Sequence, residues 1–198
     1  MKGKAPKRPT VLIFMGVAGS GKTTVAKLFA QTTGAIFYEG DDFHPPENIS
    51  KMHAGTPLTD ADRKSWLQAL RKIVVRTLAK DEFTVLTCSA LKATYRAVLA
   101  ADDARVKFVY LTGSQVLIKE RLKKRRGHFM PPALLESQFA ILEPPADAFV
   151  FSIKTSPRKS SRNWLKFWAS RFLIKFAGCF SAAKRPGRRP ATCRFPTR

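Results

Sequence analysis

Gly16-Val17-Ala18-Gly19-Ser20-Gly21-Lys22-Thr23 decides the fold of this chain. The stretch fits the pattern G-x-x-x-x-G-K-[ST], with the short apolar run before it and the helical stretch after it that the pattern requires. Its glycines let backbone N–H groups surround phosphate oxygens, and the helix N-terminus that follows adds its dipole. The stretch therefore predicts a nucleoside triphosphate site.

Individual roles follow from the chemistry of this loop. We expect Lys22 to reach the β and γ phosphates and the Thr23 hydroxyl to be a ligand of Mg²⁺. The loop alone does not separate a small-molecule kinase from a GTPase or an ATPase motor. The first 153 residues leave room for few accessory elements, which favours a small kinase. The residues expected to bind the nucleotide are Gly16, Val17, Ala18, Gly19, Ser20, Gly21, Lys22, Thr23 and Thr24.

Strand and helix patterns alternate on both sides of the loop. Short apolar runs predict strands at 11–15, 35–38, 83–88, 106–111 and 149–153. Apolar residues at three- and four-residue steps predict helices at 21–32, 60–78, 91–100, 115–124 and 134–142. This alternation predicts an α/β fold in which a parallel five-stranded sheet lies between two helical layers, as in the three-layer sandwich of P-loop NTPases.

Composition excludes several classes of protein. The 198 residues are 44% hydrophobic and 25% charged, which is typical of one globular domain. Three widely spaced cysteines give neither a disulfide framework nor a zinc pattern. The sequence shows no membrane span and no signal peptide, so we expect a cytoplasmic protein without a membrane partner.

The formal net charge of +22 is divided unevenly along the chain. All 14 acidic residues lie within residues 1–150, where the net charge is +9, whereas residues 151–198 carry +13 and no acid. A strongly basic protein suggests a nucleic-acid partner, but here the excess depends mainly on the last segment. The two parts are therefore interpreted separately.

A polar segment after the second predicted strand carries the substrate signal. It contains GDDFHPPENISKM at 40–52 and GTPLTDADR at 55–63. Open α/β sheets bind ligands beyond the carboxyl ends of their strands, where this segment begins. Its acids, histidine, lysine and arginine suit a polyhydroxylated acid.

In these residues the chain resembles the gluconokinase family of P-loop carbohydrate kinases. CSALKATYR at 88–96 and RGHFMPPALLESQF at 126–139 extend the likeness over residues 10–153. The resemblance implies a nucleoside-monophosphate-kinase-like fold with a lid, with ATP and Mg²⁺ as cofactors. It also implies phosphoryl transfer to the 6-hydroxyl of D-gluconate, whose product feeds the pentose phosphate pathway. Members of the family are commonly dimeric.

Asp41 is the residue that we expect to accept or orient the hydroxyl proton, with Asp42 as second choice. The alternative role of Asp41 is to cap a helix or turn. His44 and Lys51 are candidates for binding sugar hydroxyls and the carboxylate, although a lone histidine is often only packed or exposed.

Arg63 stands near the start of a long predicted helix, where a cation opposes the helix dipole. That position favours an anionic partner for Arg63. A salt bridge with Asp60 or Asp62 is the alternative. Lys92 and Arg96 are further candidates for binding the substrate carboxylate, Arg96 through two parallel hydrogen bonds. For Lys92, solvation on a helix surface is an equal alternative.

Two further observations concern Cys88 and Ser89, at the end of the third predicted strand. Cys88 has no partner pattern and is expected to fill core space. Ser89 stands near the place where many P-loop proteins have an acid, so Mg²⁺ is expected on Thr23, phosphates and water, with Asp41 within reach through water.

Six cations occupy eight positions from Lys119 to Arg126. Most are expected to be a solvated helix face. The stretch nevertheless resembles the family's lid, which implies nucleotide contacts by Arg121, Arg125 and His128, with Arg125 also acting in catalysis. Gly127 offers a hinge for this lid.

The family pattern stops at about Pro157, and a single lost base explains the change. If Pro157, Arg158 and Lys159 are encoded by CCG, AGG and AAA, regrouping one base earlier gives two glutamates after Ser156-Pro157. The shifted frame across Asn163 and Trp164 gives leucine. Residues from about 158 onward are therefore hypothesised to be a frameshift product, either a sequencing or gene-model error or a real mutation.

Three regions result: a basic extension at 1–9, a kinase domain at 10–156 and an atypical basic tail at 157–198. Within enzymes, the alternative is a related P-loop kinase acting on shikimate or a nucleotide. Outside enzymes, the alternative is nucleic-acid binding through the tail. A frameshift would make the tail's basic composition an accident, so we do not expect nucleic acid as a partner.

Overall fold

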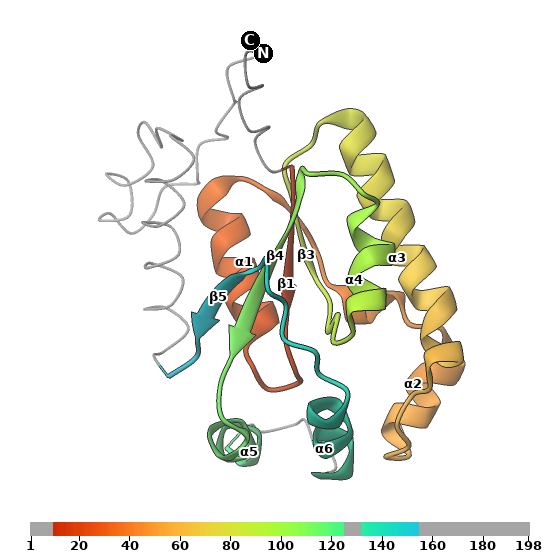
Figure 1. Cartoon of the computed structure of the whole chain (residues 1–198), viewed down its shortest axis with the longest axis vertical. Coiled ribbons are helices and arrows are strands. Elements are labelled where there is room, and N and C mark those ends of the chain that lie inside the picture. The colour runs from red at the N-terminus through yellow and green to blue at the C-terminus, as the bar shows by residue number, and fades with distance from the viewer. Residues whose placement is uncertain (1–9, 125–131, 155–198) are drawn as a thin grey trace, which may run out of the picture.

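Five parallel strands form one sheet at the centre of the molecule, in the order β2-β3-β1-β4-β5 (Figure 1). The computed structural model describes residues 10–124 and 132–154. The strands are β1 (Val11–Met15), β2 (Ile36–Tyr38), β3 (Thr84–Thr87), β4 (Val106–Thr112) and β5 (Phe149–Ser152). Every pairing is parallel, and β1 lies between β3 and β4 with all of its residues buried. The predicted five-stranded parallel sheet is confirmed.

Helices cover both faces of this sheet (Figure 1). They are α1 (Lys22–Thr33), α2 (Pro46–His53), α3 (Asp60–Lys80), α4 (Ala93–Ala100), α5 (Gln115–Lys123) and α6 (Pro132–Ala140), with a 3₁₀ turn η1 (Gly40–Phe43). Helix α1 lies on one face, whereas α3 and α4 lie on the other, and α5 and α6 lie beyond the carboxyl ends of the strands. The predicted three-layer sandwich is confirmed.

The core divides according to the alternation of side chains along β1. Ile13 and Met15 point to the α3 side, where they share a cluster with Trp66. Phe14 points to the α1 side and packs on Phe29, with ring centroids 5.8 Å apart. Because both faces are covered, the central strand is apolar throughout instead of alternating with polar residues.

The structure differs from the predicted elements mainly in the polar segment. It contains η1 and α2, whereas the sequence pattern predicted neither, because α2 buries only Asn48 and therefore lacks an apolar stripe. Helix α4 begins at Ala93, two residues later than predicted, since Ala90 has a positive φ of 44° and Lys92 is extended. No helix among the described residues has the length and apolar character needed to cross a membrane.

Candidate active site

The phosphate loop connects β1 to α1 and is held from several sides. The Ser20 N–H donates to the Val17 carbonyl at 3.2 Å, and the Gly16 N–H donates to the Ser89 carbonyl at the same distance. Gly19 has a φ of 78°, and a Cβ there would lie 2.8 Å from Leu122 Cγ. Glycine is therefore required at 19 both by backbone conformation and by space.

Lys22 is the first residue of α1, and Lys22 Nζ donates to the Val17 carbonyl at 3.2 Å. Thr23 follows Lys22, so its hydroxyl lies in the first turn of α1, where the helix dipole favours anions. Thr24, the next residue, is exposed. This arrangement can hold a polyphosphate, but the contacts of the individual loop residues with a nucleotide stay a prediction.

Three charged side chains of the predicted site lie within electrostatic range of the residue that follows β3. That residue, Cys88, is fully buried, and burial raises the pKa of its thiol to about 12. The charges of Asp41, Lys22 and Arg63 have smaller effects on the pKa of this thiol. Cys88 is thus the buried core residue that we expected.

Gly40 fixes the turn that carries Asp41. The Gly40 N–H donates to Thr87 Oγ1 at 3.0 Å, and Trp66 Nε1 donates to the Gly40 carbonyl at 2.7 Å. A Cβ at Gly40 would lie only 1.9 Å from the Thr87 carbonyl oxygen, so any side chain would push η1 away from β3. The close approach of the two backbones therefore determines the position of Asp41.

Asp41 and Asp42 both point toward solvent at the start of η1. The N-cap of η1 is Glu39, and it makes no side-chain capping bond. The Asp41 carboxylate makes no hydrogen bond within the described residues, so it does not serve as the cap that was its alternative role. It remains available to a ligand.

His44 stacks on Trp66, with ring centroids 4.1 Å apart and an interplanar angle of 15°. Burial lowers the pKa of His44, and the charge of Arg63 lowers it further, while Asp41 opposes both. Asn48 Nδ2 lies 3.4 Å from His44 Nδ1 and donates to the Asp62 carbonyl at 2.8 Å. The imidazole is thus held in place and favours its neutral form.

This depressed pKa predicts a pH dependence of stability. As the pH falls below about 6.5, the unfolded chain binds a proton at His44 before the folded chain does, so the folded state loses stability. We expect the free energy of unfolding, measured by urea titration at pH 7.5 and 5.5, to fall less in His44→Gln than in the wild type. The matched control is His53→Gln, at an exposed histidine of α2. An equal fall in His44→Gln and wild type would contradict this account.

Lys51 and Arg63 flank the start of α3. Lys51 Nζ lies 2.7 Å from Asp62 Oδ1, and this hydrogen bond, with those from Thr59, lowers the pKa of Asp62 to about 2. Asp62 and Thr59 form the capping box of α3. Arg63 is 8% exposed, donates to the Leu58 carbonyl and lies 5.8 Å from the Tyr95 ring. Within the described part of the chain, Arg63 forms no ion pair, so the alternative role, a salt bridge with Asp60 or Asp62, is not observed.

Lys92 and Arg96 have protein partners in this structure. Lys92 Nζ lies 2.7 Å from an Asp60 carboxylate oxygen, and Tyr95 donates a hydrogen bond to the same carboxylate. Arg96 donates to the carbonyls of Ala90, Leu91 and Glu143 at 3.0–3.1 Å. Lys92 therefore makes an ion pair, which the alternative role of a solvated helix residue does not include. Arg96 Nη1 donates to backbone carbonyls, and its predicted paired hydrogen bonds to a substrate carboxylate stay a prediction.

The residues predicted for the lid are only partly described. Arg121 lies in α5 and is half-buried, and its guanidinium donates to the Ile153 carbonyl. Arg125 and His128, with Gly127, lie outside the described residues. The predicted nucleotide contacts of this stretch remain predictions.

Glu39 is a candidate site residue that the sequence interpretation missed. It lies between β2 and η1, and its Oε1 accepts a hydrogen bond from the Thr87 hydroxyl. Its Oε2 is buried and has no hydrogen-bond partner among the described residues. Ser20 Oγ in the phosphate loop is in the same condition. A buried carboxylate oxygen without a protein partner is costly, and such an oxygen suits a cation or its bound water.

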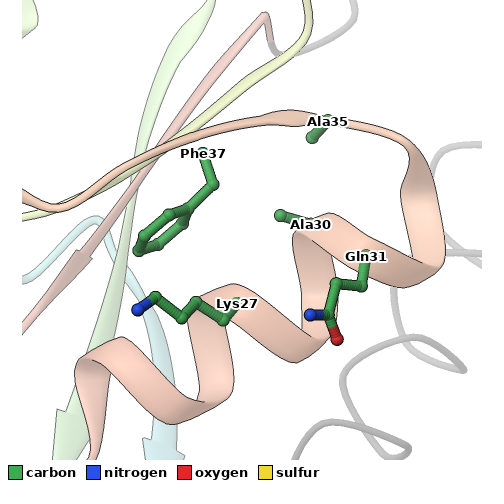
Figure 2. Close-up of a pocket in the computed structure, with 5 residues that line it drawn as sticks. All are labelled: Lys27, Ala30, Gln31, Ala35 and Phe37. Carbon is green, nitrogen blue, oxygen red and sulfur yellow. The ribbon is translucent and has the colours of Figure 1, made fainter.

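A separate cavity of about 290 Å³ lies beside the second half of α1 (Figure 2). Its lining residues are Lys27, Ala30, Gln31, Ala35 and Phe37, and Lys27 Nζ lies 5.4 Å from the centroid of the Phe37 ring. The phosphate loop precedes the opposite end of this helix. The cavity is therefore distinct from the candidate active site.

A phosphate loop before α1, a parallel sheet and an acidic turn beside β3 define a small-molecule P-loop kinase. A family model described as an AAA domain matches residues 11–145. A probable gluconokinase of Mus musculus is 48% identical over 155 residues, covering 70% of this chain and 84% of that protein. The gluconokinase of Gluconobacter oxydans (strain 621H) is 48% identical over 140 residues, covering 71% and 79%.

A solved structure agrees with these relatives. The gluconokinase from Sinorhizobium meliloti 1021 superimposes with a TM-score of 0.74 and 40% identity, covering 83% of this chain and 94% of that chain. The chain belongs to the gluconokinase family.

Proposed function

We propose that this protein transfers the γ-phosphoryl group of ATP to the 6-hydroxyl of D-gluconate, giving 6-phospho-D-gluconate and ADP. The observation that carries the proposal is the 48% identity to a gluconokinase and a probable gluconokinase, each covered over more than three quarters of its length, and the charges of Lys22, Asp41 and Arg63 that act at Cys88 support it. Phosphoryl transfer depends chiefly on alignment and on neutralising charge, and these residues supply both.

In this proposal the phosphate loop binds ATP, and Lys22 neutralises charge on the β and γ phosphates. Asp41 accepts or orients the proton of the sugar hydroxyl. Arg121, Arg125 and His128 are the proposed further nucleotide residues, and Arg125 also stabilises the transferring phosphoryl group. The proposed substrate residues, besides Asp41, are His44, Lys51, Arg63, Lys92 and Arg96.

The contacts of the substrate residues refine their roles. Lys51 and Lys92 each pair with an aspartate at the start of α3, so each has one charge partner before a sugar acid arrives. Arg63 has no acid partner in the described residues, is largely buried and is close enough to lower the pKa of His44. Arg63 is therefore the strongest candidate for the gluconate carboxylate, because a buried guanidinium gains most from an anion.

The protein's residues also fit the Mg²⁺ ion that accompanies ATP. Thr23 offers its hydroxyl in the first turn of α1, and Glu39 offers the buried, unpartnered Oε2. When bound, Mg²⁺ neutralises charge on the β and γ phosphate oxygens. No group of three or more His, Cys, Asp or Glu side chains that could hold a metal occurs among the described residues, so phosphate and water would complete the coordination.

A coupled assay of ADP release tests the substrate. We expect release with D-gluconate and none above background with shikimate or nucleoside monophosphates, and ³¹P NMR of the product should show a phosphate monoester on C6. Faster release with shikimate or a nucleotide would replace the proposal by that alternative. Nothing in the described residues favours a nucleic-acid partner enough to propose one.

We also propose that the residues from about 158 onward are out of frame. The matches to the two named relatives cover 70–71% of this chain, and an out-of-frame segment would fall in the part that is not matched. These residues lie outside those that the structure describes. Resequencing of the gene should reveal the missing base, whereas a confirmed frame together with an intact mass that includes the basic tail would refute the error.

A further inference from the structure

Helix α6 reaches the phosphate loop through one side chain. The Ala18 N–H donates to Gln138 Oε1 at 2.7 Å, across 120 positions of sequence. The helix is held independently of this bond, because Leu134 and Leu135 are buried and Lys119 of α5 pairs with Glu136 at 2.8 Å. Gln138 is therefore presented to the loop by an anchored element.

The peptide unit that Gln138 contacts is central to the loop. Its N–H belongs to Ala18 and its carbonyl belongs to Val17, so the two groups point in opposite directions from one rigid plane. The Val17 carbonyl accepts hydrogen bonds from Lys22 Nζ and from the Ser20 N–H, both at 3.2 Å. Fixing the N–H of this plane thus fixes the acceptor that holds the Lys22 ammonium.

We propose that Gln138 is a positioning residue for the phosphate loop: its amide oxygen orients the Val17–Ala18 peptide plane and, through it, Lys22 and the loop's phosphate-binding N–H groups. A Cβ at the neighbouring Gly19 would collide with Leu122 and Ile118 of α5, so α5 limits the loop from another side. A loop fixed before the nucleotide arrives loses less conformational entropy on binding. Gln138 acts through the backbone and is not assigned a contact with the reacting atoms.

The chain that follows α6 contacts the loop after β3, on the other side of the candidate active site from the phosphate loop. After α6, the Glu143 N–H donates to the Leu91 carbonyl at 2.9 Å, and Arg96 donates to the Glu143 carbonyl. Residues 132–143 therefore contact both the phosphate loop and the loop that follows β3. The proposal rests on the proposed function only for the nucleotide, since gluconate does not enter it.

Gln138→Leu tests this role in the full chain. The variant keeps an uncharged side chain, one atom shorter than glutamine, and removes the acceptor of the Ala18 N–H. We expect faster hydrogen exchange at the Ala18 amide and about three- to tenfold weaker binding of a non-hydrolysable ATP analogue by calorimetry, the range for one hydrogen bond. The KM for ATP should rise by a similar factor, while gluconate binding should not change.

Two variants make the result decisive. Gln138→Glu keeps an acceptor oxygen, so it should restore slow exchange at Ala18 in the absence of nucleotide. Ser137→Ala removes a hydrogen bond inside α6, from Ser137 Oγ to the Leu134 carbonyl at 2.9 Å, and should behave as wild type. The proposal is overturned if Gln138→Leu leaves both exchange and analogue affinity unchanged, or if Ser137→Ala reproduces its effects. These binding measurements omit gluconate, so they stand even if gluconate is not the substrate.

Discussion

Replacing Lys22 by methionine should lower kcat by about 10³-fold while the protein remains folded. Lys22 is the first residue of α1, and its ammonium group already donates a hydrogen bond to the Val17 carbonyl of the phosphate loop. The variant would lose the cation that neutralises negative charge on the transferring phosphoryl oxygens. That cation stabilises the transition state more than it stabilises the bound substrates, so kcat should fall. Steady-state ADP release at saturating ATP and gluconate measures the change.

Lys27→Met is the matched control for this prediction. Lys27 lies on the same helix but is exposed and sits over the Phe37 ring, beside the separate cavity (Figure 2). Its replacement removes the same charge without touching the phosphate loop, so kcat should stay within about twofold, as for most surface substitutions. If Lys22→Met retained wild-type kcat, the phosphate loop would not be the catalytic nucleotide site.

The order of strands and helices could be predicted because each core element has an apolar pattern typical of its type. β1 is a continuous apolar run, and α3 returns Trp66, Leu70 and Ile73 to the sheet at three- and four-residue steps. Helix α2 carries no such signal, since it buries the polar Asn48 and is held by hydrogen bonds from Asn48 and Lys51 to Asp62 in the first turn of α3. Apolar periodicity predicts helices that bury an apolar face, and it does not predict helices that polar contacts stabilise.

The candidate site was predictable where chemistry follows from local spacing. Lys22 and Thr23 belong to one motif, and Asp41 lies in the short turn η1 soon after β2. Glu39 and Gln138 depend on contacts between distant segments, with Thr87 and with Ala18, which no local pattern encodes. Glu39 could have been suspected, because an acid directly after a strand of a parallel sheet stands at its ligand-binding edge. Nothing within α6 distinguishes Gln138 from any polar residue of a helix.

The charged candidates show a related limit. Lys51, Lys92 and Arg96 were selected as cations near a sugar acid, yet each already has oxygen partners in the protein. Sequence identifies which residues carry charge, whereas the structure decides how much of that charge is already compensated. Arg63 and Arg96 donate to backbone carbonyls, whereas each lysine pairs with a carboxylate, and Arg63 is the more deeply buried of the two arginines.

Asp41→Asn should lower kcat by about 10²–10⁴-fold, the usual contribution of a general base. The amide keeps the size and the hydrogen-bonding capacity of the side chain but cannot accept the hydroxyl proton. Gly40 would still hold η1 against β3, so the position of residue 41 should not change. We therefore expect the KM for gluconate to change far less than kcat, and calorimetric binding of gluconate should persist.

Asp42→Asn provides the comparison, because Asp42 is equally exposed, lies in the same turn and loses the same charge. Asp41 is favoured because its charge acts on the pKa of both His44 and Cys88. A fall in kcat confined to Asp41→Asn would establish Asp41 as the base. The same fall confined to Asp42→Asn would move that role one residue along the turn, and wild-type kcat in both variants would exclude an aspartate of η1 as the proton acceptor.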